Sequence, residues 1–261
     1  MATPIDQSDE NGTAPPLGEP VDFTGAPFPQ RIEHRGRHVV IRPLNPDTDA
    51  QPLYRASHAP TGDESVWTYL PDGPYINTES FQAALETKAG TSDPMFFTLA
   101  RPSDGGPSDG GPDDGGPGDG GPDAGEPLGM LSYLSIVPEH GIIEIGHIWF
   151  GPQLKRTPAA TEAIFLLAKH AFDDLGYRRL EWKCNALNQA SRNAAQRFGF
   201  SYEGTFANHR VFKGRNRDTA WFAITDARWP KLRAAFETWL QPSNFDDSGR
   251  QLTRLSELTA T

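Results

Sequence analysis

The sequence predicts a mixed α/β fold in which one sheet of seven strands carries helices on both faces of a single domain. Short runs rich in β-branched and aromatic residues indicate the strands, and stretches with apolar residues three and four apart indicate the helices. These patterns follow one another as strand, two helices, three strands, helix, strand, helix and two strands.

The first half of the domain begins with a strand and two helices. Residues 38–44 (HVVIRPL) form a short β-branched run and predict the first strand. The first helix is expected to begin at Asp47 or Asp49, and the second at Asn77 or Thr78, because these residue types are good helix caps.

A β-hairpin with a very long turn is expected next. Residues 95–100 (MFFTLA) and 127–137 (PLGMLSYLSIV) flank residues 102–127, an acidic repeat of Pro, Asp and Gly with seven carboxylates and no basic residue. Its composition predicts a disordered insertion, which the fold tolerates because loop entropy grows only logarithmically with length. Calcium binding is the weaker alternative, since ligand oxygens must converge on one point.

Residues 141–150 (GIIEIGHIWF) predict a largely buried strand, and their alternation places Glu144 and Gly146 on one face. The opposite face is expected to hold Ile143, Ile145 and Trp149. A helix with one apolar stripe follows and ends at Gly176. The remaining elements are a strand at 178–187, a helix at 189–199 and two strands within 203–225.

The ends of the chain have a different composition from the domain. Residues 1–25 hold five acidic residues and no Lys or Arg, and predict a disordered leader; the domain is expected at 26–240 and a C-terminal tail at 241–261. Leader (−5) and repeat (−7) together exceed the net charge of −10, so the rest carries about +2. This near-neutral body argues against nucleic acid as an obvious partner.

Cys184 is the only cysteine, which excludes an intramolecular disulfide and a thiolate metal cluster, and the seven histidines lack metal-binding spacing. No apolar run reaches about 18 residues and the amino terminus is acidic, so neither a membrane span nor a signal peptide is expected. We therefore expect a soluble cytoplasmic protein without a metal.

The junction after residue 150 has the chemistry of an anion site. A helix that starts just after a buried strand directs free N–H groups and its positive dipole end beyond the strand. Lys155 and Arg156 add two cations there, and Thr157 could cap the helix whose first residue is Pro158. A phosphate fits best; taken alone, however, the pattern favours an ordinary helix start beside solvated cations, because many helices begin this way.

Three segments in this order resemble the GNAT superfamily of acyl-CoA-dependent N-acyltransferases, most closely the branch with the ribosomal-protein alanine and serine N-acetyltransferases. They are IEIGHIWFGP, QLKRTPAATEAI and RRLEWKCNALNQASRNAAQRFGF. The resemblance covers about Arg31 to Trp229 without the insertion, and its most specific part is the pattern around Asn188 and Ser191. It implies a mostly antiparallel sheet whose fourth and fifth strands splay apart.

The resemblance also implies acetyl-CoA as cosubstrate. In this family a turn before the helix binds the pyrophosphate with backbone amides, and the matching residues here are Lys155, Arg156, Thr157, Pro158, Ala159 and Ala160. Pro158 departs from the family pattern because it has no N–H. The pantetheine arm would lie along the backbone of Ile148, Trp149 and Phe150, and Asn188 and Ser191 would complete the cofactor site.

Amine acylation needs a general base and a proton for the leaving thiolate. Glu144 is the best base candidate, since a carboxylate inside an apolar strand should have a raised pKa; a partly solvated sheet charge is an equal alternative. His147 is a second candidate, more often a packed residue. Ser191 could protonate the sulfur, or be only a first-turn residue beside an Asn188 cap.

Other candidates are weaker. Tyr202 and Tyr133 are possible acids, and Cys184 is expected to be a buried strand residue and not a nucleophile. The family places acceptor contacts between the first two helices, so Trp67, Tyr69 and Tyr75 would wall an acceptor pocket; core packing is at least as good an interpretation.

These observations predict an N-acetyltransferase that moves acetyl from acetyl-CoA to a primary amine by direct transfer in a ternary complex. The acceptor could be a peptide or protein N-terminus, an amino sugar, a polyamine or another small amine. The alternative is a CoA-binding sensor or scaffold with little catalysis, which Pro158 favours. A protein-interaction role for the acidic repeat is a third hypothesis, and monomer and homodimer remain equally open.

Overall fold

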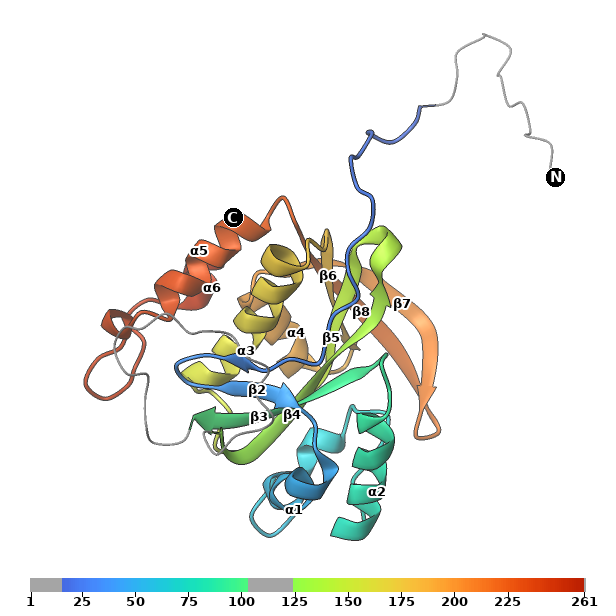
Figure 1. Cartoon of the computed structure of the whole chain (residues 1–261), viewed down its shortest axis with the longest axis vertical. Helices are drawn as coiled ribbons and strands as arrows, with labels where there is room; N and C mark the ends of the chain where they lie inside the picture. The colour runs from blue at the N-terminus through green and yellow to red at the C-terminus, as the bar shows by residue number, and fades with distance from the viewer. Residues whose placement is uncertain (1–15, 103–123, 261) are drawn as a thin grey trace, which may run out of the picture.

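The computed structural model describes residues 16–102 and 124–260 and consists of one open sheet with helices on both faces (Figure 1). The sheet has eight strands, which are β1 (His34–Arg35), β2 (Val40–Pro43), β3 (Met95–Pro102), β4 (Ala124–Val137), β5 (Ile142–Phe150), β6 (Arg179–Asn185), β7 (Ser201–Phe212) and β8 (Arg215–Thr225). Their order is β1-β2-β3-β4-β5-β6-β8-β7. Only β5 and β6 pair in parallel.

The mixed, mostly antiparallel sheet is confirmed, but the predicted number of seven strands is wrong by one. The additional strand, β1, is only two residues long and pairs His34 with Ile41 and Arg35 with Val40. A run this short has no periodicity of its own, and it is a strand only because β2 supplies its partners.

The predicted hairpin is confirmed: β3 and β4 are antiparallel neighbours, with Met95 opposite Tyr133 and Leu99 opposite Gly129. Pairing continues past two register shifts to Pro102 and Ala124, so the strands extend slightly into the repeat. The predicted insertion otherwise falls on residues 103–123, which lie outside the described residues, as do residues 1–15 of the predicted leader.

One face of the sheet carries α1 (Pro46–Ser57), the 3₁₀ turn η1 (Glu64–Trp67) and α2 (Thr78–Ala89). Asn45 caps α1 by accepting from the Asp47 N–H, so the predicted Asp47 or Asp49 cap is wrong. Asp49 lies inside the helix, fully buried, where Arg42 and Thr98 satisfy its carboxylate. Asn77 caps α2, as expected, in a capping box with Ser80.

The other face carries α3 (Pro158–Lys169), the π-helical turn η3 (His170–Asp174), α4 (Gln189–Arg197), α5 (Trp229–Trp239) and α6 (Leu255–Thr259). Two short 3₁₀ turns, η2 (Pro138–His140) and η4 (Pro242–Asn244), complete the described elements. The main apolar core lies between this helical layer and the sheet. Within the segment predicted as a C-terminal tail, Leu255 is fully buried and α6 packs on α5.

A buried carboxylate fixes the position of α3. The Glu162 side chain accepts from the N–H groups of Arg37, His38 and Val39 at 3.0, 2.6 and 3.1 Å. These three amides belong to the turn between β1 and β2, so one side chain of α3 closes that turn and ties the helix to the edge of the sheet.

No helix in the described part of the chain is both long enough and apolar enough to cross a membrane.

Candidate active site

The two parallel strands separate halfway along the sheet, as the predicted splay requires. Their pairing covers Ile142 with Arg179, Ile143 with Leu180 and Glu144 with Glu181, and no later pair is formed. β5 continues for six residues beyond Glu144, while β6 stays paired with β8 along its whole length. A gap therefore opens in the sheet just after Glu144.

A β-bulge in β5 coincides with this gap. Ser132 of β4 pairs with Gly146 and Met130 pairs with Trp149, so three steps on β5 oppose two on β4, and His147 takes a φ of 50°. The bulge reverses the alternation. Trp149 packs in the cluster beneath α1 and α2, whereas Ile143 and Ile145 pack in the core beneath α3, so their predicted common face is wrong.

The N-terminus of α3 has no side-chain cap. Thr157 occupies the cap position without capping, because its hydroxyl donates to the Leu154 carbonyl at 2.8 Å. Helix amides at N2 and N3, here of Ala159 and Ala160, have no carbonyl partner within their own helix. Pro158, at the first position, has no N–H to satisfy, so its place there costs the helix nothing.

Of the two cations in this turn, one is engaged. The Lys155 ammonium pairs with Asp63 at the start of η1, and this lysine holds the pKa of the Asp63 carboxyl at about 2. Arg156 is exposed and has a φ of 61°. Among the described residues, Arg156 thus remains the cation beside the uncapped helix end, and Lys155 links the turn to η1.

Asn188 and Ser191 lie together at the start of α4. Asn188 caps the helix by accepting from the Ser191 N–H at 3.0 Å. The Trp182 indole N–H donates to Ser191 Oγ at 3.0 Å, which leaves the hydroxyl proton available to a second acceptor. Trp182 belongs to the core beneath α3, so Ser191 is on the opposite side of the sheet from α1 and α2.

Glu144 lies on the other side, in a network of buried charges. Its carboxylate is 5% exposed, pairs with the Lys183 ammonium at 2.9 Å and accepts from Ser135 Oγ at 3.2 Å. Lys183 also binds Glu181 at 2.7 Å and lies over the Trp221 ring. Burial raises the pKa of the Glu144 carboxyl, and the nearby Lys183 opposes part of this shift.

The aromatic residues expected in the acceptor pocket are packed or hydrogen-bonded. Trp67 is 2% exposed and donates to the Ser57 carbonyl, and Tyr75 donates to Asp72 at 2.7 Å. Tyr69 is partly exposed and reaches the Leu187 carbonyl at 3.4 Å, across the gap on the β6–α4 connection.

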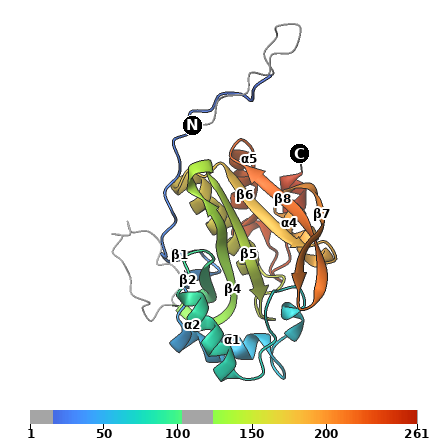
Figure 2. The ribbon, with the colours of Figure 1, turned by 90° about the vertical axis from the view of Figure 1, so that its right-hand side faces the viewer.

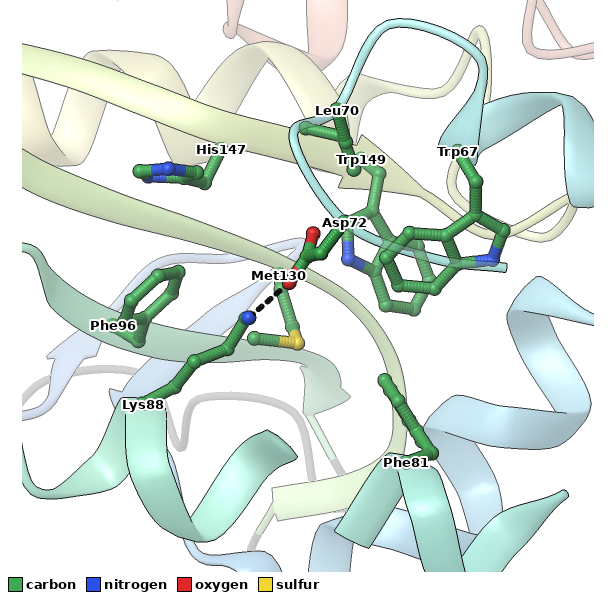
Figure 3. A pocket seen from close by; sticks show the side chains of 9 residues that line it. All are labelled: Trp67, Leu70, Asp72, Phe81, Lys88, Phe96, Met130, His147 and Trp149. Atoms are coloured by element: carbon green, nitrogen blue, oxygen red, sulfur yellow. Dashed lines mark hydrogen bonds and ion pairs between the residues drawn. The ribbon is translucent and has the colours of Figure 1, made fainter. Parts of the chain in front are cut away.

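A small pocket lies between η1, α2 and β5 (Figure 3). Its lining is Trp67, Leu70, Asp72, Phe81, Lys88, Phe96, Met130, His147 and Trp149. Asp72 pairs with Lys88, and the His147 ring faces them across the pocket (Figure 3). His147 Nδ1 lies 2.9 Å from Ser132 Oγ, and burial lowers its pKa to about 4, so the imidazole is neutral at pH 7.

The other candidates lie elsewhere. The Tyr133 hydroxyl is fully buried and donates to the Leu167 carbonyl at 2.5 Å. Tyr202 is 47% exposed on β7 and bonds to Thr205. Cys184 is buried in β6 as expected, and burial raises the pKa of its thiol. Among the residues that the structure describes, no three His, Cys, Asp or Glu side chains gather as metal ligands would.

Sequence reasoning missed Lys183 and Asp72. Lys183 alternates with the buried Leu180, Trp182 and Cys184, so the polar face of β6 was visible in the sequence. Asp72 sits in a Pro-Asp-Gly-Pro segment that looks like an ordinary turn, and its pairing with Lys88 on α2 has no local signature.

Comparisons with known proteins agree with this architecture. The model of the acetyltransferase (GNAT) domain matches residues 38–201. A crystal structure of "a GCN5-related N-acetyltransferase" from Brucella melitensis is 39% identical, covers 92% of this chain and 99% of its own, and superposes with a TM-score of 0.80. "A probable acetyltransferases (GNAT family)" structure from Chromobacterium violaceum is 37% identical, with coverages of 84% and 98% and a TM-score of 0.68.

RimL, a "ribosomal L7/L12 alpha-N-protein acetyltransferase", shares the fold at 17% identity, with coverages of 73% and 91% and a TM-score of 0.55. No curated protein sequence matches the chain. The family match spans well over half of the 261 residues, and two solved relatives exceed 30% identity over most of the chain. This chain therefore belongs to the GNAT family of acetyltransferases.

Proposed function

We propose that the chain is an acetyl-CoA-dependent N-acetyltransferase that passes the acetyl group directly to a primary amine in a ternary complex. The observation that carries the proposal is the gap after Glu144, which has a buried carboxylate on one side of the sheet and the Ser191 hydroxyl on the other. A thioester held in such a gap would be reached by an acceptor from one side and by a proton donor from the other.

The α3 N-terminus is the proposed site of the cofactor's pyrophosphate. The amides of Ala159 and Ala160 and the exposed Arg156 supply donors and positive charge there. The backbone of Ile148, Trp149 and Phe150, which lies beyond the last β5–β6 pair, would hold the pantetheine arm. Asn188 orients the first turn of α4, so that Ser191 faces the gap.

Each catalytic residue has one task in this proposal. The Glu144 carboxylate takes a proton from the acceptor ammonium, and the freed nitrogen bonds to the thioester carbon. When the carbon–sulfur bond breaks, Ser191 gives its proton to the departing thiolate and recovers one from solvent, to which the acylated nitrogen loses its second proton. The raised pKa of Glu144 makes it a stronger base than an exposed carboxylate.

The alternative, a CoA-binding sensor or scaffold, is favoured by two features of the turn. Pro158 lacks an N–H, and the engagement of Lys155 with Asp63 removes one cation from the phosphate site. Both features change the phosphate site and leave Glu144 and Ser191 in place, so binding of acetyl-CoA by itself does not distinguish a sensor from an enzyme. A measurement of turnover distinguishes the enzyme from the sensor.

The test measures binding and turnover separately. Acetyl-CoA is titrated calorimetrically, with desulfo-CoA and ADP as comparisons. Turnover with a panel of peptides, amino sugars and polyamines is followed by release of free thiol, and the only cysteine of the chain, Cys184, is buried and should give little background.

Glu144→Gln should leave acetyl-CoA affinity unchanged and lower kcat by about a hundredfold or more, the usual contribution of a general base. Wild-type kcat/KM should fall as pH drops through the raised pKa of Glu144, and the variant should lose this acid limb. Glu257→Gln, at an exposed glutamate of α6, is the matched control. Binding without turnover on any amine would favour the sensor; an unaltered rate and pH profile in Glu144→Gln would show that Glu144 is not the base.

A further inference from the structure

The strands β6 and β8 present two very different faces. Their apolar face, with Leu180, Trp182 and Phe222, packs in the main core against the α3 layer. The other face, on the same side as Glu144, holds Glu181 and Lys183 of β6 and Trp221 of β8, and Lys183 is the direct neighbour of Trp221. This is the side from which the proposed base would meet an acceptor.

Arg217 lies on the same face of β8, four residues before Trp221 and thus two alternations along the strand. Its guanidinium stacks over the Phe212 ring at 4.5 Å. Its Nε is buried and has no hydrogen-bond partner among the described residues. Burial lowers the pKa of this guanidinium, and the negative charge of Glu144 opposes part of the shift.

A partly buried guanidinium without a partner is uncommon, because burying a charge is costly unless it is paired. Arg42 pairs with Asp49 at 2.6 Å, and Arg179 pairs with both Glu181 and Glu203, whereas Arg197 donates to the Thr161 hydroxyl. The missing partner of Arg217 is best explained as a ligand that carries negative charge.

The β7–β8 hairpin carries further cationic side chains near Arg217. Arg210 lies directly opposite Arg217, and Arg215 is two residues away on the same face of β8. Among the described residues, none of these three arginines forms an ion pair, and neither does Lys213 at the turn. Of the two carboxylates in the hairpin, Asp218 accepts from the Asn208 amide and the Asn216 side chain, and Glu203 pairs with Arg179.

The hairpin leans toward the acceptor side. The Lys213 ammonium donates to the Trp67 carbonyl of η1 at 2.6 Å, and Figure 2 shows the hairpin tip beside this segment. Its cations therefore form a strip on the same side of the sheet as Glu144, which runs outward along the strands from Trp221. Neighbouring sites on one face of a strand are about 7 Å apart, which is also the spacing of alternate side chains of an extended peptide.

We propose that the acceptor is an acidic peptide segment, whose first carboxylate after the reactive amine binds Arg217 and whose next acidic side chains lie along Arg215 and Arg210. The inference rests on the proposed function only for the placing of the amine at Glu144. A small acid would occupy Arg217 and leave the other two cations unused, which is why the strip favours a peptide.

The test uses two pentapeptide amides with free amino termini, Ala-Asp-Ala-Asp-Ala and Ala-Asn-Ala-Asn-Ala, titrated calorimetrically into the full chain with and without saturating desulfo-CoA. The acidic peptide should bind wild type about tenfold to a hundredfold more tightly, the range for hydrogen bonds to a charged group. Arg217→Gln should bring the two peptides within about threefold of each other, and Arg217→Lys should keep part of the preference because it keeps the charge.

Arg250→Gln, at an exposed arginine after α5, is the matched control and should change nothing. Thermal melts establish that each variant is folded, and Arg217→Lys serves as the measured variant if Arg217→Gln is not. Because binding is measured without turnover, a chain that fails to acetylate any amine would refute the proposed function and leave this result standing.

Four outcomes would overturn the inference: equal binding of the two peptides to wild type, a preference that survives Arg217→Gln, an equal loss of acetyl-CoA affinity in that variant, or competition by γ-aminobutyrate as effective as the acidic peptide. The third would assign Arg217 to the cofactor and the fourth would assign the site to small acids. An RNA oligonucleotide that binds more tightly than the peptide would likewise reassign the hairpin.

Discussion

Glu162 gives the sharpest stability prediction, because one side chain closes a turn far away in the sequence. Its carboxylate accepts from three backbone amides at 2.6 to 3.1 Å, and Glu162 is only 6% exposed. Glu162→Ala leaves those amides without an acceptor. We assign about 2 kcal/mol to the buried Val39 amide and about 1 kcal/mol to each of the other two, which water can partly reach.

The sum is a loss of about 4 kcal/mol in the free energy of unfolding, which lowers Tm by about 8 to 16 °C for a domain of this size. Urea unfolding followed by circular dichroism measures the first quantity, and a thermal melt measures the second. Glu139→Ala, at an exposed glutamate of η2, is the control and should change stability by less than about 0.5 kcal/mol.

Gly36 allows the contact itself to be tested. A Cβ on Gly36 would lie 2.4 Å from the Glu162 carboxyl group, so Gly36→Ala should be destabilising in wild type and much less so when Glu162 is already alanine. A double-mutant cycle should give a coupling of at least about 1 kcal/mol. Additive effects, or a loss below about 1 kcal/mol in Glu162→Ala with an unchanged m-value, would refute the reasoning.

Two further predictions concern charge. In the wild type, Asp63 neutralises Lys155, so Asp63→Asn should release this lysine toward the proposed phosphate site. Calorimetry at low salt should then show acetyl-CoA binding a few-fold more tightly. Weaker binding would mean that the Asp63–Lys155 pair is needed to shape the turn. Burial lowers the pKa of His34 to about 4 in the folded chain. In the unfolded chain His34 becomes protonated below about pH 6.5, whereas in the folded chain it becomes protonated only near pH 4. The stability that His34 contributes is therefore complete above pH 6.5 and lost as pH falls toward 4, and His34→Gln should reduce the slope of unfolding free energy against pH by about 1.4 kcal/mol per unit in that window. An identical slope in urea titrations of both proteins would contradict it.

Periodicity predicted the elements that bury a regular face, and local chemistry predicted some of their ends. The apolar stripe of α3, the hairpin strands β3 and β4, and the Asn188 cap of α4 all depend on residues near one another in the sequence. The bulge in β5 had a local signal too, because a glycine inside a strand pattern often marks one, and Gly146 precedes the bulged His147.

The remaining features depend on partners that sequence cannot place. Asp63 and Lys155 are 92 residues apart, and Glu144 meets Lys183 only because β5 and β6 are adjacent. Thr157 is a good cap by composition, yet its hydroxyl bonds backward to Leu154, which leaves the helix end open. Residue type shows that a threonine is able to cap a helix, but the conformation of the preceding turn determines whether its hydroxyl bonds to the helix amides or to another group.

Net charge, which the sequence gives directly, likewise does not predict the acceptor. The chain carries −10 and its body about +2, a balance that selects no acceptor. Several acidic side chains of the body are held in internal pairs, as with Asp49, Asp63, Asp72 and Glu144, whereas Arg210, Lys213, Arg215 and Arg217 of the β7–β8 hairpin have no such partner among the described residues. A recognition surface is set by the charges that remain after internal pairing, so a nearly neutral body can still present a positive strip beside its catalytic gap. The acidic and neutral peptides measure this remainder directly, since they differ in charge and in little else.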